Sequence, residues 1–384
     1  MLFRSGRCRS YVDPILGTTI DNGNHLVLAG NVAVARYLET IGAVSPLNGP
    51  DHADFAFVDL AGGERWTLAI NDGRLPWWIM SRRRRVPGSR AADYLALTRL
   101  LSRRDQRIDQ LVAPRSPLWR KLVDPVFRAI LNTAPEEASS ALTGNVLRET
   151  LARGGRATRP LIATISLSAS FIDPALAWLA ERGSTARSGR RLRSIEFDCD
   201  RVAALEWNDG RQDIASNEAV ILAVPPWVGL TLVPGLSAPT EHRAIVNAHF
   251  AFTRRLPVPK MLGLIGGAAE WLFVYPDRIS VTVSAADALL DHDRAELAAI
   301  FWRDIQHAFG ISDPMPQWQI VKERRATFAA TPQQNALRPG ARTAWTNLFL
   351  AGDWVQTNMP ATIEGALRSG DSAARLAAGQ AVRY

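Results

Sequence analysis

The sequence predicts an α/β protein with two domains. Its 384 residues exceed the roughly 250 to 300 at which a single hydrophobic core stops growing. Residues 347–374 add a second observation, because a short apolar strand, a Gly-Asp corner and a helix follow one another there. Open parallel sheets that bind ligands beyond their strand ends have this order. The third observation is that a mostly helical stretch, residues 61–180, is followed by strand-rich stretches.

The expected elements follow from turn residues and hydrophobic periodicity. Helices bracketed by Pro, Gly or Ser are expected at 91–101, 117–132 and 135–152. Two strands that meet at 198–200 are expected within 193–206, and later strands at 219–224, 272–275 and 279–284. A helix at 293–309, a strand at 347–351 and a helix that begins at Pro360 complete the series.

Residues 219–236 carry no charge and reach the length of a membrane-spanning helix. That interpretation is rejected, since Pro225 and Pro226 lie near the middle of the run. The first part, AVILAV, is rich in β-branched residues and is typical of a buried parallel strand.

The Gly-Asp corner places the carboxylate of Asp353 just beyond a strand, directly after Gly352. The helix that follows is built largely of small residues, so it can approach a ligand closely. Its first turn offers free backbone N–H groups and the positive end of the helix dipole, which favour a negatively charged group. Spacing alone leaves a second interpretation open, an ordinary amphipathic terminal helix packed on a sheet.

The same segment, LAGDW followed by PATIEGALRSG, resembles the carboxyl-terminal FAD signature of the amine oxidase and phytoene desaturase superfamily. Within it, the chain is most similar to the hydroxysqualene dehydroxylase branch, the squalene-associated FAD-dependent desaturases. The supporting stretches span nearly the whole chain: GRCRS at 6–10, IDNGNHLVLAGN at 20–31, RVPGSRAADYLAL at 85–97, ISVTVSAADALL at 279–290 and VKERRATFAATP at 321–332.

The resemblance implies an FAD-dependent oxidoreductase that acts on an apolar, squalene-type isoprenoid. In the matching branch, hydroxysqualene loses its hydroxyl group and receives a hydride from reduced FAD. Three alternatives stay open: a carotenoid desaturase, an amine oxidase, and a non-catalytic fragment that binds a lipid or a partner. The sequence identifies no electron donor for the flavin.

The resemblance also implies the domain organisation. An FAD-binding, Rossmann-like domain is expected from residues 1–60, 186–236 and 326–384. An α+β substrate domain, interleaved with it in sequence, is expected from 61–185 and 237–325.

One feature departs from the family pattern. Family members open with a strand, a G-x-G-x-x-G turn and a helix that hold the FAD pyrophosphate. Here the family's arginine element follows five residues after the start, with Ser5 where its first Gly is expected, and no glycine cluster elsewhere has the G-x-G-x-x-G spacing. We therefore expect a βαβ unit of about 35 to 40 residues to be missing from this sequence, which would then hold FAD weakly.

The cofactor residues implied by the resemblance come from both ends of the chain. The arginine element should lie against the FAD diphosphate and flavin, where guanidinium groups suit phosphate. Asp353 should accept hydrogen bonds from ribityl or ribose hydroxyls, and the start of the last helix should offer N–H groups to the flavin's pyrimidine edge. The expected cofactor-binding residues are Gly6, Arg7, Arg9, Ser10, Gly352, Asp353, Pro360, Ala361, Thr362, Ile363 and Glu364.

Asp21, Asn24 and His25 of the DNGNH loop, together with Asn22, are the candidates for the polar, catalytic end of the substrate pocket. The alternative is a polar turn that satisfies its own backbone. Glu323, Arg324 and Arg325 either line the cavity or form an ion-pair cluster at a strand edge.

The net charge of +8 is locally concentrated: Arg82, Arg83, Arg84, Arg85 and Arg90 follow the apolar run 75–80. This suits either the surface of an anionic bilayer or a solvated arginine face. Nucleic acid is not expected as a partner, because no nucleic-acid-binding motif accompanies the arginines.

Cys8 and Cys199 form no disulfide framework, so a reducing cytoplasm fits, with peripheral association at the inner face of the plasma membrane as an option. No signal peptide and no metal-ligand spacing are found in the sequence.

Overall fold

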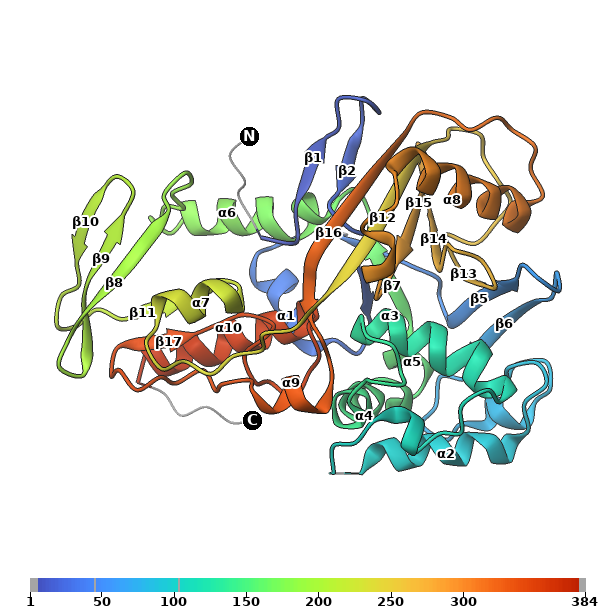
Figure 1. Cartoon of the computed structure of the whole chain (residues 1–384), viewed down its shortest axis with the longest axis horizontal. Helices are drawn as coiled ribbons and strands as arrows, with labels where there is room; N and C mark the ends of the chain where they lie inside the picture. The colour runs from blue at the N-terminus through green and yellow to red at the C-terminus, as the bar shows by residue number, and fades with distance from the viewer. Residues whose placement is uncertain (1–5, 45, 103, 380–384) are drawn as a thin grey trace.

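A computed structural model describes residues 6–44, 46–102 and 104–379 of the chain. Strands and helices are mixed throughout, and the strands form one seven-stranded sheet, one parallel pair and three small antiparallel sheets (Figure 1). The predicted α/β class is confirmed by this arrangement. In the described residues no helix combines the length and the apolar character needed to cross a bilayer.

The seven-stranded sheet has the order β16-β12-β15-β14-β13-β5-β6. Only β13 and β5 pair in parallel, and the other neighbours are antiparallel. The strands are β5 (Ala53–Asp59), β6 (Arg65–Ile70), β12 (His242–Ala251), β13 (Met261–Ile265), β14 (Trp271–Val274), β15 (Arg278–Val283) and β16 (Trp318–Phe328). Strand β15 is buried along its whole length, as its Ile and Val residues favour.

Both faces of this sheet are covered. Helix α8 (Arg294–Phe309) packs one face through Leu297, Phe301 and Ile305, which share a core with Val246 and Phe250. It begins where predicted, because Asp293 caps it by accepting the backbone N–H groups of Ala295 and Glu296. On the other face, Phe57 and Trp271 join the core of the helical segment that contains Trp119 and Leu122.

That helical segment is broken into short pieces. They are α2 (Leu95–Thr98), α3 (Arg128–Leu131), α4 (Ser140–Glu149), α5 (Gly155–Thr158), a π-helix (Trp119–Phe127) and 3₁₀ helices at Trp77–Met80, Ala91–Tyr94, Arg99–Leu101, Ile108–Gln110 and Leu151–Arg153. The prediction of a helix from residue 135 was wrong by five residues. Helix α4 starts only at Ser140, because the Ser139 hydroxyl caps it by accepting the backbone N–H of Leu142 (3.1 Å).

The predicted strand, corner and helix are present at the carboxyl end. Strand β17 (Leu348–Leu350) pairs in parallel with β11 (Val220–Leu222), and α10 (Ile363–Ala377) packs on β17 through Ala373. Beside them lie the antiparallel meander β8 (Leu192–Asp198), β9 (Arg201–Trp207) and β10 (Gly210–Asp213), and the short helices α7 (Pro226–Leu232) and α9 (Pro332–Ala336).

Pro360 is not the first residue of α10, contrary to the prediction. The helix begins at Ile363, because Thr362 has extended backbone angles and its hydroxyl accepts the N–H of Gly365 (3.1 Å). The start of the helix is therefore set by the Thr362 cap, which accepts the N–H three residues later. Pro360 precedes the helix and is not part of it.

A smaller core connects the two ends of the chain. Helix α1 (Val32–Thr40) lies beside α10, and Val34 and Leu38 pack with Ile363 and Leu367 (Figure 1). The other elements here are β1 (Ser10–Val12), β2 (Thr19–Asp21), β3 (Leu26–Leu28), β4 (Leu47–Asn48), β7 (Pro160–Ala163), α6 (Asp173–Ala180), a π-helix (Ser168–Ile172) and, near β15, a 3₁₀ helix (Asp287–Leu289).

Two strand pairings join segments that were expected to lie in different domains. Strand β5, within the expected cofactor range 1–60, pairs with β13 of the seven-stranded sheet. Strand β7, within the expected substrate range 61–185, pairs with β3 and β4. The segments expected in the cofactor domain and those expected in the substrate domain are therefore linked by backbone hydrogen bonds.

Candidate functional site

The Gly-Asp corner after β17 is tightly held. Gly352 has φ +140°, and a Cβ atom there would lie 2.8 Å from Trp354 Nε1, so only glycine fits without displacement. The Gly352 N–H donates to the Ser369 hydroxyl of α10 (2.8 Å), and the Trp354 indole donates to the Val224 carbonyl (2.8 Å). These contacts fix the direction in which Asp353 leaves the sheet.

Arg338 is a site residue that the sequence interpretation missed. Its guanidinium donates to the backbone carbonyls of Asp353 (3.2 Å), Trp354 (3.2 Å) and Val355 (2.7 Å). The side chain is buried, and burial lowers its pKa to about 10, partly offset by Asp353. No spacing rule points to an arginine in this loop, so only the three-dimensional structure identifies it as the anchor of the corner.

The first turn of α10 has the open N–H groups that the cofactor prediction requires. The Thr362 hydroxyl accepts from Gly365, and the N–H groups of Ile363 and Glu364 have no acceptor among the described residues. Free N–H groups at a helix start suit a carbonyl oxygen or an anion. Pro360 and Ala361 precede this turn, and Pro360 is buried.

The Glu364 side chain binds other parts of the protein. Its carboxylate accepts the backbone N–H groups of Ala33 (3.1 Å) and Val34 (3.0 Å) at the start of α1, and it also accepts from Arg368 (2.8 Å). Arg368 in turn pairs with Glu149. Glu364 therefore caps a neighbouring helix with its side chain, while only its backbone faces the predicted cofactor position.

The structure brings the arginine element to the Gly-Asp corner. Arg7 forms an ion pair with Asp353 and donates to the Ala326 carbonyl of β16 (2.6 Å). Burial opposes the charge of Arg7, but Asp353 and Glu323 outweigh it and raise the Arg7 pKa. The Arg7 side chain is still 41% exposed, against 6% for Asp353, so the guanidinium lies at the open edge of the site. Gly6 is exposed.

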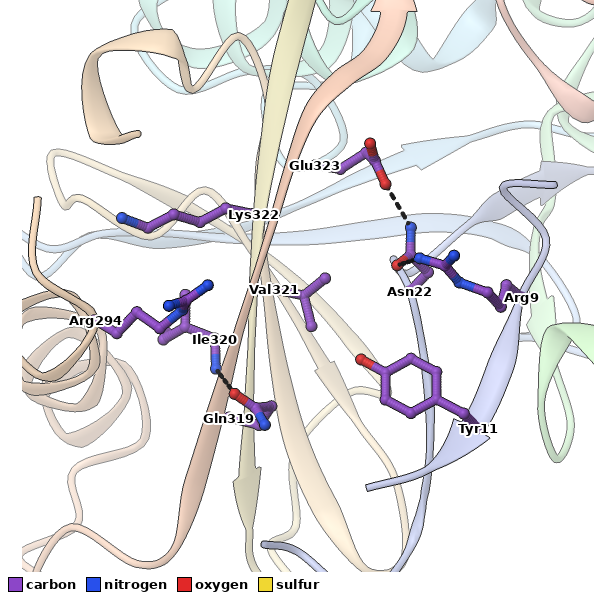
Figure 2. A pocket seen from close by; sticks show the side chains of 9 residues that line it. All are labelled: Arg9, Tyr11, Asn22, Arg294, Gln319, Ile320, Val321, Lys322 and Glu323. Atoms are coloured by element: carbon purple, nitrogen blue, oxygen red, sulfur yellow. Dashed lines mark hydrogen bonds between the residues drawn. The ribbon is translucent and has the colours of Figure 1, made fainter. Parts of the chain in front are cut away.

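Asn22 and Asn24 hold the DNGNH loop in place. The Asn22 amide accepts from Arg9 (2.6 Å) and donates to Glu323 (3.0 Å), so it lies between the arginine element and β16 (Figure 2). The Asn24 amide donates to the Thr282 hydroxyl (3.0 Å) and accepts from the Tyr275 hydroxyl (3.3 Å). Both amides therefore bind side chains of other elements, and neither binds the loop's own backbone as the polar-turn alternative expects.

Asp21 is likewise committed. One carboxylate oxygen accepts from the Ser10 hydroxyl (2.5 Å) and from the Leu167 N–H (2.9 Å), and the residue is buried. Burial raises its pKa, while these two hydrogen bonds and Arg278 lower it. Asp21 thus ties the β1–β2 hairpin to the segment before the π-helix Ser168–Ile172.

His25 differs from Asn22 and Asn24, because no hydrogen bond involves either of its ring nitrogens among the described residues. Burial, helped by the positive charge of Arg7 and opposed by Asp353, lowers its pKa to about 4. His25 is therefore neutral at pH 7, and it shares the electrostatic surroundings of Arg7 and Asp353. The arginine element and the DNGNH loop, both near the start of the sequence, thus meet the Gly-Asp corner, whose Asp353 is 346 positions from Arg7.

A cavity of about 370 Å³ opens beside this region, between the β1–β2 hairpin and β16 (Figure 2). Its lining is largely polar and consists of Arg9, Tyr11, Asn22, Arg294, Gln319, Ile320, Val321, Lys322 and Glu323. Glu323 lines this cavity, in line with one of the two alternatives for residues 323–325. Arg324 and Arg325 do not line it and are exposed, and Arg325 lies over the Trp227 ring at 5.0 Å.

No group of three or more His, Cys, Asp or Glu residues in the described ranges is placed to hold a metal ion. The donors and acceptors described above fit the flavin end of the expected cofactor. The two N–H groups of α10 and the second oxygen of Asp353 can bind polar atoms, and Arg7 can bind an anion.

Comparison with known proteins gives the family of this arrangement. The family model described as flavin containing amine oxidoreductase matches residues 6–378. The hydroxysqualene dehydroxylase of Sinorhizobium fredii is 49% identical over 373 residues, which cover 97% of this chain and 89% of that protein. The hydroxysqualene dehydroxylase of Rhodopseudomonas palustris is 50% identical over 382 residues, or 98% of this chain and 91% of that protein.

Solved structures agree on the fold. An oxidoreductase from Methanosarcina mazei superposes with a TM-score of 0.67 at 13% identity, covering 94% of this chain and 90% of the other. A putrescine oxidase variant superposes with a TM-score of 0.63 at 15% identity, covering 97% of this chain and 91% of the other. The predicted fold and flavin cofactor are confirmed by these matches, and the chain belongs to the flavin-containing amine oxidoreductase family.

Proposed function

We propose that this flavoenzyme, with FAD as its cofactor, reduces hydroxysqualene to squalene. The observation that carries the proposal is the similarity to hydroxysqualene dehydroxylases, 47% to 50% identity over 97% to 98% of this chain. Similarity at this level and coverage spans every part of the candidate site. Arg7, His25 and Asp353 lie near one another, and we propose that the reaction takes place beside them.

The cofactor would be held at its flavin end by this chain's own groups. Asp353 would accept from hydroxyls, the N–H groups of Ile363 and Glu364 would bind carbonyl oxygens, and Arg7 would stabilise negative charge. When bound, a reduced flavin supplies a hydride. Arg9, Ser10 and Gly6 belong to the same segment as Arg7, and Arg9 contacts the loop residue Asn22 rather than Asp353.

In the proposed reaction the C–O bond of the substrate breaks, its hydroxyl leaves as water after taking up a proton, and the carbon receives a hydride. His25 would contact the hydroxyl, because its ring nitrogens have no hydrogen-bond partner among the described residues, whereas the Asn22 and Asn24 amides bind protein groups. A neutral imidazole N–H can donate a hydrogen bond that orients the leaving group. Asp21 and Asn24 would act through the loop, as positioning residues, by the hydrogen bonds that hold it.

We propose the same division of labour along the chain as the sequence predicts, with residues 1–60, 186–236 and 326–384 serving the cofactor and residues 61–185 and 237–325 serving the substrate. Strand β16 supports the link between them, because Glu323 contacts Asn22 and Ala326 contacts Arg7. A cytoplasmic enzyme attached peripherally to the inner face of the membrane would meet its oily substrate there.

The test is a single-turnover assay with isotope labelling. The chain is loaded with FAD, reduced without oxygen in D₂O and mixed with hydroxysqualene in detergent, and the product is analysed by mass spectrometry. Squalene that carries one deuterium is the expected product. Absence of squalene from an FAD-loaded enzyme that instead oxidises phytoene or putrescine would overturn the proposal in favour of a desaturase or an amine oxidase.

His25 is tested in the same assay. His25→Gln should lower the rate of the chemical step by about 10- to 100-fold, because the flexible amide does not reproduce the orientation of the imidazole N–H. FAD affinity should change little. His52, an exposed histidine near Asp72, provides the control substitution His52→Gln, which should react like the unaltered chain.

A further inference from the structure

Positive charge is concentrated in one segment, residues 72–121. This segment contains 13 Arg and Lys against four Asp, whereas the whole chain contains 45 Arg and Lys against 37 Asp and Glu. The rest of the chain is therefore nearly neutral, and the excess charge belongs to this segment. In Figure 1 it includes α2, at the lower right, and lies far from the parallel pair β11–β17 at the left.

The arginines of this segment are available to a partner. Among the described residues, those between positions 74 and 90 form no ion pair with a carboxylate, and Arg74, Arg82, Arg83 and Arg84 are exposed. The acidic residues that flank these arginines have other contacts: Asp72 lies 3.8 Å from His52, and Asp93 accepts the backbone N–H of Arg90 (2.6 Å). Internal pairing thus leaves this charge uncompensated.

Large apolar side chains are exposed in the same place. Leu75, Trp77, Met80 and Leu95 are 64% to 67% exposed, and they are four of the six large apolar side chains of the described chain that exceed 60%. Residues three apart in a 3₁₀ helix lie on one side of it, so Trp77 and Met80 point the same way from the helix Trp77–Met80. A surface that combines such side chains with unpaired arginines is uncommon on a monomer.

The segment is held rigidly, so the exposure does not come from a loose chain. Trp78 is buried and meets the Tyr94 ring edge-on at 5.1 Å. The Tyr94 hydroxyl accepts the backbone N–H of Val86 (2.9 Å), and the Ser89 hydroxyl donates to the Val86 carbonyl (2.6 Å). The 3₁₀ helix, the arginine loop and the start of α2 therefore form one unit that presents Trp77 and Met80 outward.

We propose that the exposed side chains of residues 74–95, here called the basic–apolar surface, bind the surface of an anionic lipid bilayer. Arginines attract anionic headgroups, tryptophan partitions to the interface, and aliphatic side chains enter the acyl boundary. Single-stranded nucleic acid is the other partner that takes arginine and tryptophan together. The bilayer fits better, because Leu75, Met80 and Leu95 have no flat face on which a base can stack.

This surface would attach the chain to the membrane. The inference rests on the peripheral location given under the proposed function and does not depend on which substrate the enzyme reduces. The full chain is sedimented with vesicles of phosphatidylglycerol and phosphatidylcholine, and with vesicles of phosphatidylcholine alone. Binding is expected to the anionic vesicles and to weaken with added salt. Equal binding to both, or none, overturns the proposal.

Two variants separate the contributions. Replacing Arg82, Arg83 and Arg84 by Gln should weaken binding to anionic vesicles about 100-fold, which corresponds to about 1 kcal/mol per arginine. Replacing Trp77 and Met80 by Ser should weaken it about tenfold or more. Both variants should keep the turnover of detergent-solubilised hydroxysqualene, so that failure of the surface and failure of the proposed function give different results.

The matched control replaces three exposed arginines elsewhere, Arg187, Arg191 and Arg193, by Gln. It removes the same net charge and should change vesicle binding by less than about threefold. An equal loss in this control would mean that net charge alone is responsible, and the surface would be disproved. The surface would instead be assigned to nucleic acid if single-stranded oligonucleotides bound tightly and displaced the vesicles, and if replacing Met80 did not change that binding.

Discussion

Asp353 is the residue on which the cofactor site depends most. One of its oxygens accepts from Arg7, and its backbone carbonyl accepts from Arg338, so the carboxylate is fixed with its second oxygen free. The sequence predicted this carboxylate from its place after an apolar strand and a glycine. It did not predict the Arg338 anchor, since no local rule links residues 15 positions apart in a loop.

Asp353→Asn should weaken FAD binding by about 10- to 100-fold, because a hydrogen bond to a charged group contributes about 1.5 to 3 kcal/mol and the amide also loses its ion pair with Arg7. Fluorescence titration of FAD measures the effect. Asp371→Asn on α10 serves as the control, since the ion pairs of Asp371 within the described residues are with Arg36 and Arg375. An unchanged affinity in Asp353→Asn would show that this carboxylate does not touch the cofactor.

The carboxyl group of Glu270 gives the molecule a pH-dependent stability. Burial raises its pKa to about 7, although the Ser284 N–H (2.8 Å) and Arg128 favour the charged form. A carboxyl group with a folded pKa above its unfolded value binds more protons when folded, so its stabilising contribution is complete below about pH 4.5 and is lost as pH rises through 7. His25 and His249 act in the opposite direction, since burial lowers their pKa values to about 4 and about 3.

Glu270→Gln should therefore raise stability at pH 8 by about 2 kcal/mol and leave it nearly unchanged at pH 4, because the amide keeps the acceptor for Ser284 without the buried charge. Urea unfolding at the two pH values measures this difference. Glu39→Gln, at an exposed position on α1, should leave both values unchanged. A Glu270→Gln chain that loses stability at pH 8 would show that the ion pair with Arg128 outweighs burial.

At the scale of elements, the packing of α1 against α10 shows where local patterns succeed and fail. Hydrophobic periodicity located α10. The small residues on it predicted close approach to a ligand, and in the structure Ala373 packs on β17. The exact start was mispredicted, because the choice between Pro360 and Thr362 depends on a hydroxyl that bonds Gly365 in the folded chain. The cap of α1 was missed altogether, since Glu364 lies 331 residues away from Ala33.

Glu364→Ala should destabilise the protein by about 3 to 5 kcal/mol. The substitution leaves the N–H groups of Ala33 and Val34 buried without an acceptor and removes one partner of Arg368. Glu364→Gln retains an acceptor and should cost less than half as much. Thermal unfolding of the two variants measures the difference, and equal losses would show that charge rather than capping makes Glu364 important.

At the scale of the whole molecule, the sequence predicted the fold class and the family, because motifs such as GRCRS, DNGNH and LAGDW stand in a fixed order along the chain. It could not predict the order of the seven-stranded sheet, in which β5 joins β13 across about 200 residues. The hydrophobic periodicity of a strand indicates which of its side chains are buried. The order of strands in a sheet depends on long-range contacts between segments, which periodicity does not indicate. The expected domain ranges therefore place β5 in the cofactor domain and β7 in the substrate domain, although each pairs with strands from the other range.

The whole set of cofactor contacts also predicts which half of FAD this chain binds. The groups proposed to contact the cofactor, Arg7, Asp353 and the N–H groups of Ile363 and Glu364, suit the flavin end. The 384 residues contain no G-x-G-x-x-G turn, the element that holds a pyrophosphate on backbone N–H groups at a helix start. The adenosine half of FAD should thus add little binding energy to this chain.

FAD and FMN should therefore bind to the 384-residue chain with dissociation constants that agree within about tenfold, a difference of at most about 1.4 kcal/mol. Titration calorimetry with FAD, FMN and ADP measures this directly, and ADP should bind too weakly to detect. Fusing a strand, Gly-rich turn and helix from a relative to the amino end should strengthen FAD binding alone, because the new N–H groups contact the pyrophosphate and not the flavin ring. A chain that prefers FAD over FMN by more than 100-fold without that fusion must hold the diphosphate with other groups. Arg9, on the same segment as Arg7, would be the first to replace.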